Sequence, residues 1–313
     1  MKQPHFTIAA VEHEVGLSKD VLRVWERRYG FPAPGRDANG ERMYSAAQVS
    51  RLRLIKRLMD RGHRPGRLMG ISVKELEALC ATAADARDAR AVRGSADVDS
   101  LLERLRHRDV SGYVQVVQQR LARQGLRLFV QDTVAPLAVE VGLAWERGRL
   151  QVFEEHLFTE ATTRVLRQAI ASVPGGGAPR VLLTTLPSEP HGMGLLMLEA
   201  VLALEGAQCI SLGTQTPLLE IVAAAAAHEA DVVALSFSAA FRRRQVPALL
   251  QQLRAALPRR IGLWAGGAGV HKVAVPEGVT CMASLDDAAA AVHGWRSAAT
   301  VDSEATSPRA RRP

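Results

Sequence analysis

Three short motifs, each at the end of an apolar run, carry side chains that could bind a metal-containing cofactor. They supply Glu189, His191, Gly192 and Gly194, then Ser236 and Ser238, and finally Gly266 and Gly267. The runs over 181–186, 231–235 and 261–265 are typical of buried parallel strands. Ligands of such sheets bind just beyond the carboxyl ends of the strands. We therefore expect a histidine, two serines and paired glycines to meet at one edge of a sheet.

His191 is the member of this group that is best suited to bind a metal, because transition metals accept an imidazole nitrogen well. Glu189, two residues earlier, can hold the other ring nitrogen, which fixes the tautomer and raises the basicity of the ring. The glycines let the backbone approach a bulky ligand. The small serine side chains leave room for that ligand and can donate hydrogen bonds to it.

The set resembles the cobalamin-binding module of methionine synthases, corrinoid proteins and mutases, whose pattern is Asp-x-His-x-x-Gly, Ser-x-Leu/Thr and Gly-Gly. The resemblance implies that His191 is the lower axial ligand of cobalt. It would replace the base of the cofactor's own nucleotide, whose tail then threads into the sheet. Glu189 stands where this family usually has Asp. A single histidine in a loop is usually not a metal ligand. Here the order and spacing of all three motifs favour His191 as the cobalt ligand.

The composition predicts a globular chain of two or three domains. The sequence has 313 residues, of which 47% are hydrophobic and 23% are charged. Its cysteines, Cys80, Cys209 and Cys281, have no ligand spacing and predict no disulfide framework. We find neither a signal peptide nor an apolar run of membrane length, so we expect a cytoplasmic protein without a membrane partner.

Positive charge is concentrated near the N-terminus. Residues 1–75 hold 15 Lys and Arg against 8 Asp and Glu, whereas residues 76–313 hold 25 against 24. A basic excess that is confined to one small unit is typical of nucleic-acid binding. A codon bias toward arginine would raise arginine everywhere and would not unbalance one end.

Residues 1–78 predict a winged helix-turn-helix domain. The expected elements are a short helix over 7–13, a turn at Gly16, a second helix over 19–28 with Ser18 as its N-cap, a two-stranded wing over 36–44 with Asn39-Gly40 as its turn, and a longer helix over 48–61. Trp25 is either a core residue or packs on the sugar-phosphate edge of DNA, and we favour the core.

The stretch 24–45 closely resembles the winged helix of MerR-type regulators, and the resemblance extends from residue 6 to about residue 74. It rests on Val-Trp-Glu-Arg-Arg-Tyr-Gly-Phe-Pro at 24–32 and on the wing residues after it. It implies operator DNA as a partner, with helix 19–28 in the major groove and the wing on the backbone or minor groove. The candidate DNA-binding residues are Lys19, Arg23, Arg27, Arg28, Tyr29, Arg36, Arg42 and Tyr44.

The rest of the chain predicts two further domains. Residues 79–97 are expected to be a linker, 98–173 a four-helix bundle, 174–179 a Pro/Gly-rich linker, 180–298 a doubly wound parallel sheet, and 299–313 a disordered tail. The predicted fold class is therefore multidomain, α together with α/β: a winged helix-turn-helix, a helical bundle and a Rossmann-like cobalamin-binding domain.

Trp145, Glu155 and His156 form a Trp-x9-Glu-His pattern in the predicted bundle. It resembles the bundle of CarH-type photoreceptors, MerR-family repressors that hold adenosylcobalamin, and with the other motifs this resemblance covers nearly the whole chain. It implies that Trp145 and Glu155 enclose the adenosyl group, with indole against adenine, and that His156 lines the site. One departure is Glu146, because the photoreceptors have there a histidine that binds cobalt after light has removed the adenosyl group.

The resemblance implies a cobalamin-dependent, light-responsive transcriptional repressor without enzymatic activity. In the dark, the form that holds adenosylcobalamin would assemble into a dimer or tetramer and bind operator DNA; photolysis of the Co–C bond would release the DNA. Two other classes stay open. A light-independent cobalamin sensor is favoured by Glu146, and a corrinoid-carrying enzyme subunit is disfavoured by the basic winged helix.

Overall fold

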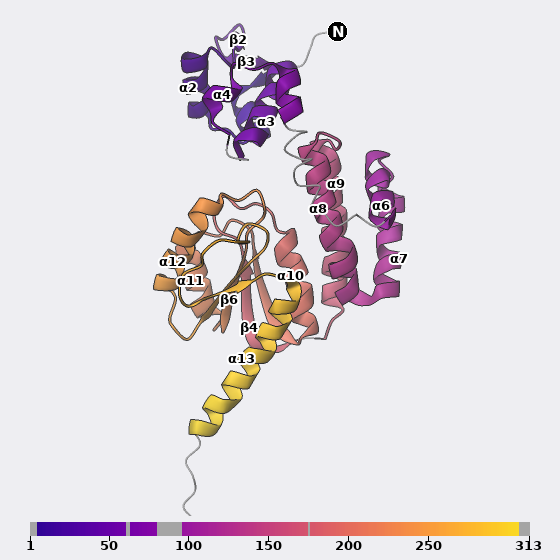
Figure 1. Cartoon of the computed structure of the whole chain (residues 1–313), viewed down its shortest axis with the longest axis vertical. Coiled ribbons are helices and arrows are strands. Elements are labelled where there is room, and N and C mark those ends of the chain that lie inside the picture. Colours follow the sequence, from indigo (N-terminus) through magenta and orange to yellow (C-terminus); the bar gives the residue numbers. More distant parts are fainter. Residues whose placement is uncertain (1–4, 61–62, 80–95, 175, 307–313) are drawn as a thin grey trace, which may run out of the picture. The chain divides into compact units, whose positions relative to one another are not determined.

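The chain folds into two compact units, and the computed structural model describes residues 5–60, 63–79, 96–174 and 176–306. The first unit comprises Met1–Arg93 with Gly142–Gln151, and the second comprises Gly94–Val141 with Val152–Pro313. Figure 1 shows their helices and strands. Most of the predicted linker at 79–97 lies outside the described residues.

A helix-turn-helix opens the first unit, as predicted. Its helices α1 (Ile8–Val15) and α2 (Lys19–Tyr29) are separated by a turn in which Gly16 has a φ of 69°, a left-handed conformation that suits glycine. Ser18 caps α2, because its hydroxyl accepts a hydrogen bond from the Val21 N–H. The next elements are β2 (Gly35–Arg36), β3 (Arg42–Ser45), α3 (Ala46–Asp60) and α4 (Pro65–Leu68).

One strand of this unit was not expected from the sequence. β1 (His5–Thr7) pairs antiparallel with β3 and gives a three-stranded sheet of order β1-β3-β2. Trp25 is 5% exposed and lies in the core, the placement that we favoured. Tyr44 is fully buried in the same core. Our prediction that Tyr44 contacts DNA is therefore wrong, because the alternation of side chains along β3 turns its ring inward.

The bundle consists of the predicted four helices. They are α6 (Ala96–Arg106), α7 (Val110–Leu128), α8 (Ala135–Glu146) and α9 (Val152–Ala171). No loop separates α7 from α8. Instead, Gly125 leaves the helical conformation with a φ of 74° and a ψ of 163°, and a π-helical turn, η1 (Phe129–Val134), comes next. Tyr113 of α7 and Thr162 of α9 are joined by a buried hydrogen bond of 2.6 Å.

The continuous stretch Val110–Glu146 is an exception to our expectation that the chain has no apolar run of membrane length. By length and composition alone it could cross a membrane, with a mean hydropathy of 1.2 over its most apolar window. That is weak evidence, because core helices of bundles pass the same test. Several of its large apolar side chains, among them Phe129, Val130 and Leu137, are buried, whereas Leu128 and Val139 are exposed.

The C-terminal domain is a doubly wound five-stranded parallel sheet, as predicted, with strand order β5-β4-β6-β7-β8. Its elements are β4 (Gly177–Thr184), α10 (Met193–Leu204), β5 (Ala207–Gly213), α11 (Leu218–Ala227), β6 (Val232–Ser236), η2 (Arg243–Gln245), α12 (Val246–Ala256), β7 (Gly262–Gly266), β8 (Val279–Met282) and α13 (Leu285–Thr306).

Two boundaries of this domain differ from the prediction. β4 begins at Gly177, inside the predicted linker 174–179, because Gly177 already pairs with Ala207 of β5. Helix α13 continues to Thr306, inside the predicted disordered tail, and residues 307–313 lie outside the described residues.

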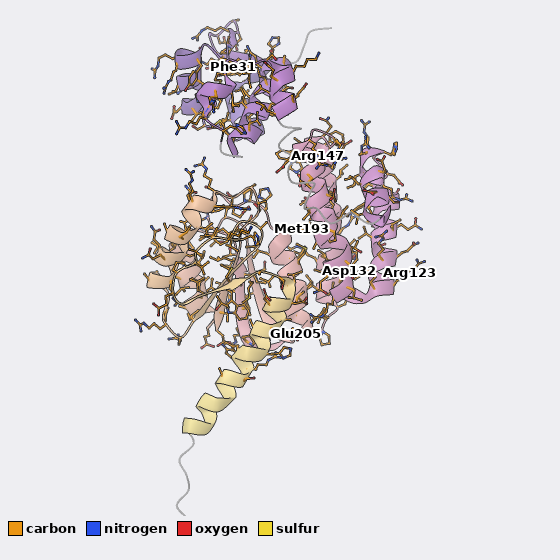
Figure 2. All side chains as sticks on the ribbon, viewed as in Figure 1. Phe31, Arg123, Asp132, Arg147, Met193 and Glu205 are labelled. Atoms are coloured by element: carbon orange, nitrogen blue, oxygen red, sulfur yellow. The ribbon has the colours of Figure 1, made fainter. Side chains whose placement is uncertain are left out.

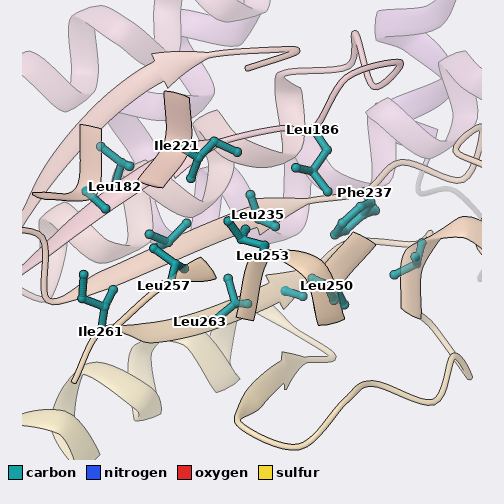
Figure 3. Packing of buried hydrophobic residues seen from close by; sticks show 14 of the residues in the cluster. Leu182, Leu186, Ile221, Leu235, Phe237, Leu250, Leu253, Leu257, Ile261 and Leu263 are labelled. Carbon is teal, nitrogen blue, oxygen red and sulfur yellow. The ribbon is translucent and has the colours of Figure 1, made fainter. Parts of the chain in front are cut away.

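Each face of the sheet is covered by a pair of helices. On one face α11 and α12 close a core that contains Leu235, Phe237 and Leu250 (Figure 3). On the other face α10 and α13 pack together over a second core that includes Leu183 and Trp264. Helix α10 also packs against α9, so the bundle is attached to the sheet on this face.

Candidate functional site

The strand order places a topological switch point between β4 and β6. The chain leaves β4 to form β5 on one side, and the next strand, β6, lies on the other side of β4. Ligands of open α/β sheets bind at the carboxyl ends of the strands at such a point. The loops after these two strands carry the first two predicted motifs, and Ser238 lies just beyond the end of β6.

Glu189 joins these two loops. Its Oε1 lies 2.6 Å from His191 Nδ1 and accepts the His191 N–H at 3.1 Å and the Ser238 hydroxyl at 3.1 Å. Its Oε2 accepts the Ser238 N–H at 2.7 Å. The carboxylate side chain is 1% exposed, whereas that of His191 is 53% exposed. Because Glu189 engages Nδ1, the histidine can offer Nε2 to a ligand.

The pKa values of the two side chains shift in opposite directions. The hydrogen bond to Glu189 raises the pKa of His191; burial opposes this effect, and the charges of Glu189 and Glu155 add to it. Burial alone would raise the pKa of Glu189, but hydrogen bonds from His191 and Ser238, with the charge of His191, outweigh it and hold that pKa below its usual value. The site therefore keeps an ionised carboxylate against the imidazole.

Two of the predicted glycines are required by packing within the protein. A Cβ at Gly194 would lie 2.5 Å from Ser236 Oγ, so α10 approaches β6 closely at the start of the helix. Gly267 has a φ of 94°, and a Cβ there would lie 2.4 Å from the Phe237 carbonyl oxygen. Ser236 is buried, with 8% exposure. These residues set the close spacing of α10, β6 and the loop after β7.

The other two glycines lie at the same edge. A Cβ at Gly192 would meet Thr214 at 3.2 Å, and one at Gly266 would meet Met282 at 3.4 Å. The contact at Gly192 is tight, so Thr214 would have to shift, whereas the contact at Gly266 is of ordinary van der Waals length.

Two threonines at the end of β4 belong to the site and were not named from the sequence. The hydroxyl of Thr185 donates to the Glu189 carbonyl at 2.6 Å and accepts the Gln215 N–H at 2.8 Å. Thr184 Oγ1 lies 2.7 Å from Thr216 Oγ1. Both threonines are fully buried; Thr185 holds the loop that carries Glu189, and Thr184 holds the segment after β5. Polar residues at the end of an apolar run are the signal that could have identified them.

The bundle residues of the predicted site lie on two helices. Glu155 and His156 are in the first turns of α9, with Glu155 Oε2 3.4 Å from His156 Nδ1 and Glu155 Oε1 accepting the Thr159 hydroxyl at 2.8 Å. Glu155 is near enough to His191 for its charge to raise the pKa of that histidine. Trp145 is half-buried at the end of α8, in the segment Gly142–Gln151 that groups with the first unit.

Helix α2 carries five of the eight predicted DNA-binding residues, and three of these are exposed. Arg23, Arg27 and Arg28 are exposed. On the wing, Arg36 is exposed and its guanidinium donates to the Gly40 carbonyl at 2.6 Å, which stiffens the hairpin turn. The basic residues of helix and wing thus lie on one small unit.

Three of the remaining predicted residues are partly buried. Arg42 of the wing forms an ion pair with Glu26 of α2 at 2.8 Å, so it holds the wing against the helix. Lys19 Nζ lies 3.5 Å from Glu12 Oε2. The guanidinium carbon of Arg28 lies over the ring of Tyr29, 5.3 Å from the centroid of that ring.

Comparison with known proteins agrees with this architecture. A model described as "MerR HTH family regulatory protein" matches residues 6–71, and two models of B12 binding domains match residues 98–170 and 179–291. The HTH-type transcriptional repressor CarH of Myxococcus xanthus is 31% identical over 274 residues, which are 87% of this chain and 91% of that protein. CarA of the same organism is 30% identical, over 86% of this chain and 89% of CarA.

A solved structure shares the fold of a large part of this chain. The monomethylamine corrinoid protein of Methanosarcina barkeri superimposes with a TM-score of 0.50 at 16% identity, over 62% of this chain and 96% of that protein. A MerR-type DNA-binding domain that is joined to B12-binding domains defines a cobalamin-binding transcriptional regulator. The chain belongs to the family of CarH- and CarA-type repressors. Proteins of this family are repressors and not enzymes, as expected.

Proposed function

We propose that cobalamin binds with His191 Nε2 as the lower axial ligand of cobalt. The arrangement of Glu189, His191 and Ser238 at the switch point carries this proposal. An imidazole suits the metal, and a buried carboxylate on Nδ1 makes the ring a stronger donor. Gly194 and Gly267 let α10 and the loop after β7 pack closely against Ser236 and Phe237, at the same edge of the sheet.

We further propose that the cofactor is adenosylcobalamin and that the protein responds to light. Bound adenosylcobalamin would supply a Co–C bond that light breaks. Trp145 would provide a flat apolar surface for the adenosyl group, the carboxylate of Glu155 would accept its hydrogen bonds, and His156 would line the same site. Loss of the group removes these contacts and loosens the attachment of the bundle.

The bundle contacts couple the cofactor to DNA binding. We propose that the dark form assembles into a dimer or tetramer, so that several winged helices bind operator DNA at once. The cofactor favours assembly because it binds one assembly state better than the other. Candidate DNA contacts come from Lys19, Arg23, Arg27, Arg28, Tyr29 and Arg36, with Arg42 fixing the wing.

A light-independent cobalamin sensor is the second candidate, and Glu146 is the observation that favours it. The residue directly after Trp145 is a carboxylate here, where CarH-type photoreceptors have a histidine. In that case cobalamin concentration alone would control assembly.

Light and dark measurements on one preparation separate the two functions. Full-length protein is loaded with adenosylcobalamin in the dark, and its visible spectrum and sedimentation mass are recorded before and after green light. The proposal expects a changed spectrum together with a lower mass. Protein loaded with cyanocobalamin, which has no adenosyl group, is the control. If the sedimentation mass depends on adenosylcobalamin but does not change on illumination, the protein is a light-independent cobalamin sensor instead.

A further inference from the structure

The carboxyl edge of the sheet carries positive charge that is not part of the predicted cofactor-binding set. The loops after β6 and β7 contain four cationic residues, Arg242, Arg243, Arg244 and Lys272, which we call the basic rim. The charge is local, because residues 76–313 are nearly balanced, with 25 Lys and Arg against 24 Asp and Glu. A local excess on one edge needs an explanation of its own.

The acidic residues of this edge are mostly engaged elsewhere. Glu189 is buried and bonded to His191 and Ser238. Asp286 accepts a hydrogen bond from Gln131 at 2.6 Å, and Asp287 accepts the N–H groups of residues 283 and 284 at 2.9 Å. Glu277, in the loop after β7, is the one acidic side chain of these loops that has no described bond.

The two loops form one surface. Arg243 Nη2 donates to the Ala268 carbonyl at 3.2 Å, and the Gly269 N–H donates to the Phe237 carbonyl at 2.9 Å. A Cβ at Gly269 would lie 2.6 Å from the Ser238 carbonyl oxygen, so no side chain separates the loops there. These contacts hold the arginines after β6 next to the loop that carries Lys272.

The arginines of the rim are available for binding. Arg242 and Arg244 are exposed, and within the described residues neither side chain forms a hydrogen bond or ion pair. By contrast, Arg254 of the following helix donates to three carbonyl oxygens. Arg242–Arg244 also lead directly into α12, whose first turn has no acidic residue. Cations at a helix N-terminus are unfavourable for the helix, so stability does not explain them.

We propose that the basic rim is a second DNA-contacting surface, which binds the phosphate backbone of duplex DNA without reading its sequence. Guanidinium groups pair with phosphate oxygens in a bidentate manner, and such contacts supply affinity and position rather than specificity. The only aromatic residue of these two loops besides Phe237 is Phe241, and both rings are buried, so the rim has no stacking surface for single strands. The inference rests on the DNA binding of the family and is independent of light.

The salt dependence of DNA binding tests the proposal. Full-length protein, loaded with adenosylcobalamin and kept in the dark, is titrated with a random-sequence duplex several helical turns long over a range of salt concentrations. R242Q/R244Q should lower the slope of log affinity against log salt by about 2, and K272Q by about 1, because each lost phosphate contact removes about 0.9. The matched control is R259Q/R260Q, which removes the same charge from the exposed loop between α12 and β7, at the opposite edge of the sheet.

The visible spectrum and sedimentation mass of every variant are measured with the titration. The proposal predicts wild-type values of both for R242Q/R244Q together with a reduced slope. Equal slopes for the rim variant and the control would overturn it. A reduced slope that appears only with a lower mass would overturn it too, because the rim would then join two copies of the chain. If R242Q/R244Q loses cobalamin, the two arginines hold the cofactor. In that case K272Q decides, and an unchanged slope of log affinity against log salt for K272Q would exclude DNA contact by the rim.

Discussion

Glu189 connects the two halves of the candidate site through one carboxylate. It accepts hydrogen bonds from the backbone N–H and the side chain of both His191 and Ser238. The family usually has Asp at this position, and the longer side chain still reaches both partners here. A buried charge with this many donors is well satisfied. The orientation of the imidazole therefore depends on Glu189 more than on any other described side chain.

Replacement of these two residues should affect cobalamin differently. H191A removes the proposed ligand and should lose cobalamin or leave it bound in a base-on or water-ligated form. E189Q keeps the size of the side chain but removes its charge, so the ring becomes a weaker donor, and affinity should fall about 10- to 100-fold. Visible spectra and retention on desalting measure both effects. E277Q, which alters an acidic residue in the loop after β7, is the control, and an unchanged spectrum of H191A would exclude His191 as the ligand.

The opposite pKa shifts predict how the ligand-free protein responds to pH. Because the pKa of His191 is raised, its contribution to stability is complete below pH 6.5 and is lost as the pH rises through the folded value. Because the pKa of Glu189 is lowered, its contribution is complete above pH 4.5 and is lost as the pH falls through the folded value. The pair should therefore stabilise most between pH 4.5 and 6.5.

Thermal melting of the wild type and E189Q across this pH range measures the effect. The difference between their melting temperatures should be largest inside the window and should shrink on both sides. A difference that is independent of pH would show that Glu189 acts through packing alone. Cobalamin uptake should weaken toward acid pH as well, because ligation must displace a proton from the imidazole.

At the scale of elements, an ion pair joins the wing to α2, and we propose that the two bind DNA as one body. Arg23 is exposed on α2, whereas Arg42 reaches Glu26 from the wing. R23A should weaken DNA binding and reduce its salt dependence, because it removes a proposed phosphate contact. R42A should weaken binding through a misplaced wing, and E26Q should do the same although it adds positive charge. Gel shifts over a salt series, with cobalamin uptake as the control, distinguish these effects; stronger binding by E26Q would mean that Arg42 contacts DNA directly.

The attachment of bundle to sheet depends on a polar cluster at the end of α10. Arg127 of α7 pairs with Glu205, which also lies 2.9 Å from His293 of α13. The Glu205 side chain is 14% exposed, so removing its partner leaves a poorly solvated charge. R127A should cost about 1 kcal/mol and lower the melting temperature by roughly 2–4 °C. R123A, which alters an exposed arginine of the same helix (Figure 2), should have no effect; equal melting of both variants would contradict the role of the cluster.

Strands, helices and the order of the motifs were predictable because they depend on local patterns. The apolar runs before Glu189, Ser236 and Gly266 predicted three strands, and Ser18 predicted the start of α2. Features that depend on long-range packing were not predictable. The short strand β1 forms only because β3 offers it an edge. Tyr44 was predicted to contact DNA because it lies beside basic residues in the sequence, and the sequence alone does not show whether its ring points inward or outward.

At the scale of the whole molecule, Glu146 should determine the fate of the cofactor after illumination. A carboxylate is a weaker partner than imidazole for this metal, so the lit protein should release cobalamin or recharge with fresh adenosylcobalamin readily. E146H should instead give a stable bis-imidazole spectrum and retain cobalamin on desalting. H156A tests whether His156 supplies a second imidazole in the native protein. A bis-imidazole spectrum of the native protein that survives H156A would contradict both versions.

The dependence of Glu189 on Ser238 also has a consequence for the protein during its synthesis. His191 is made long before Ser238, but the carboxylate that orients it has its full set of donors only when the strand β6 has paired with β4. A nascent chain that ends before residue 232 therefore exposes the histidine without an ordered site. The segment that forms β6 must therefore be synthesised before the chain can retain its cofactor. Stalled chains of increasing length should begin to retain cobalamin only after Ser238 has left the exit tunnel.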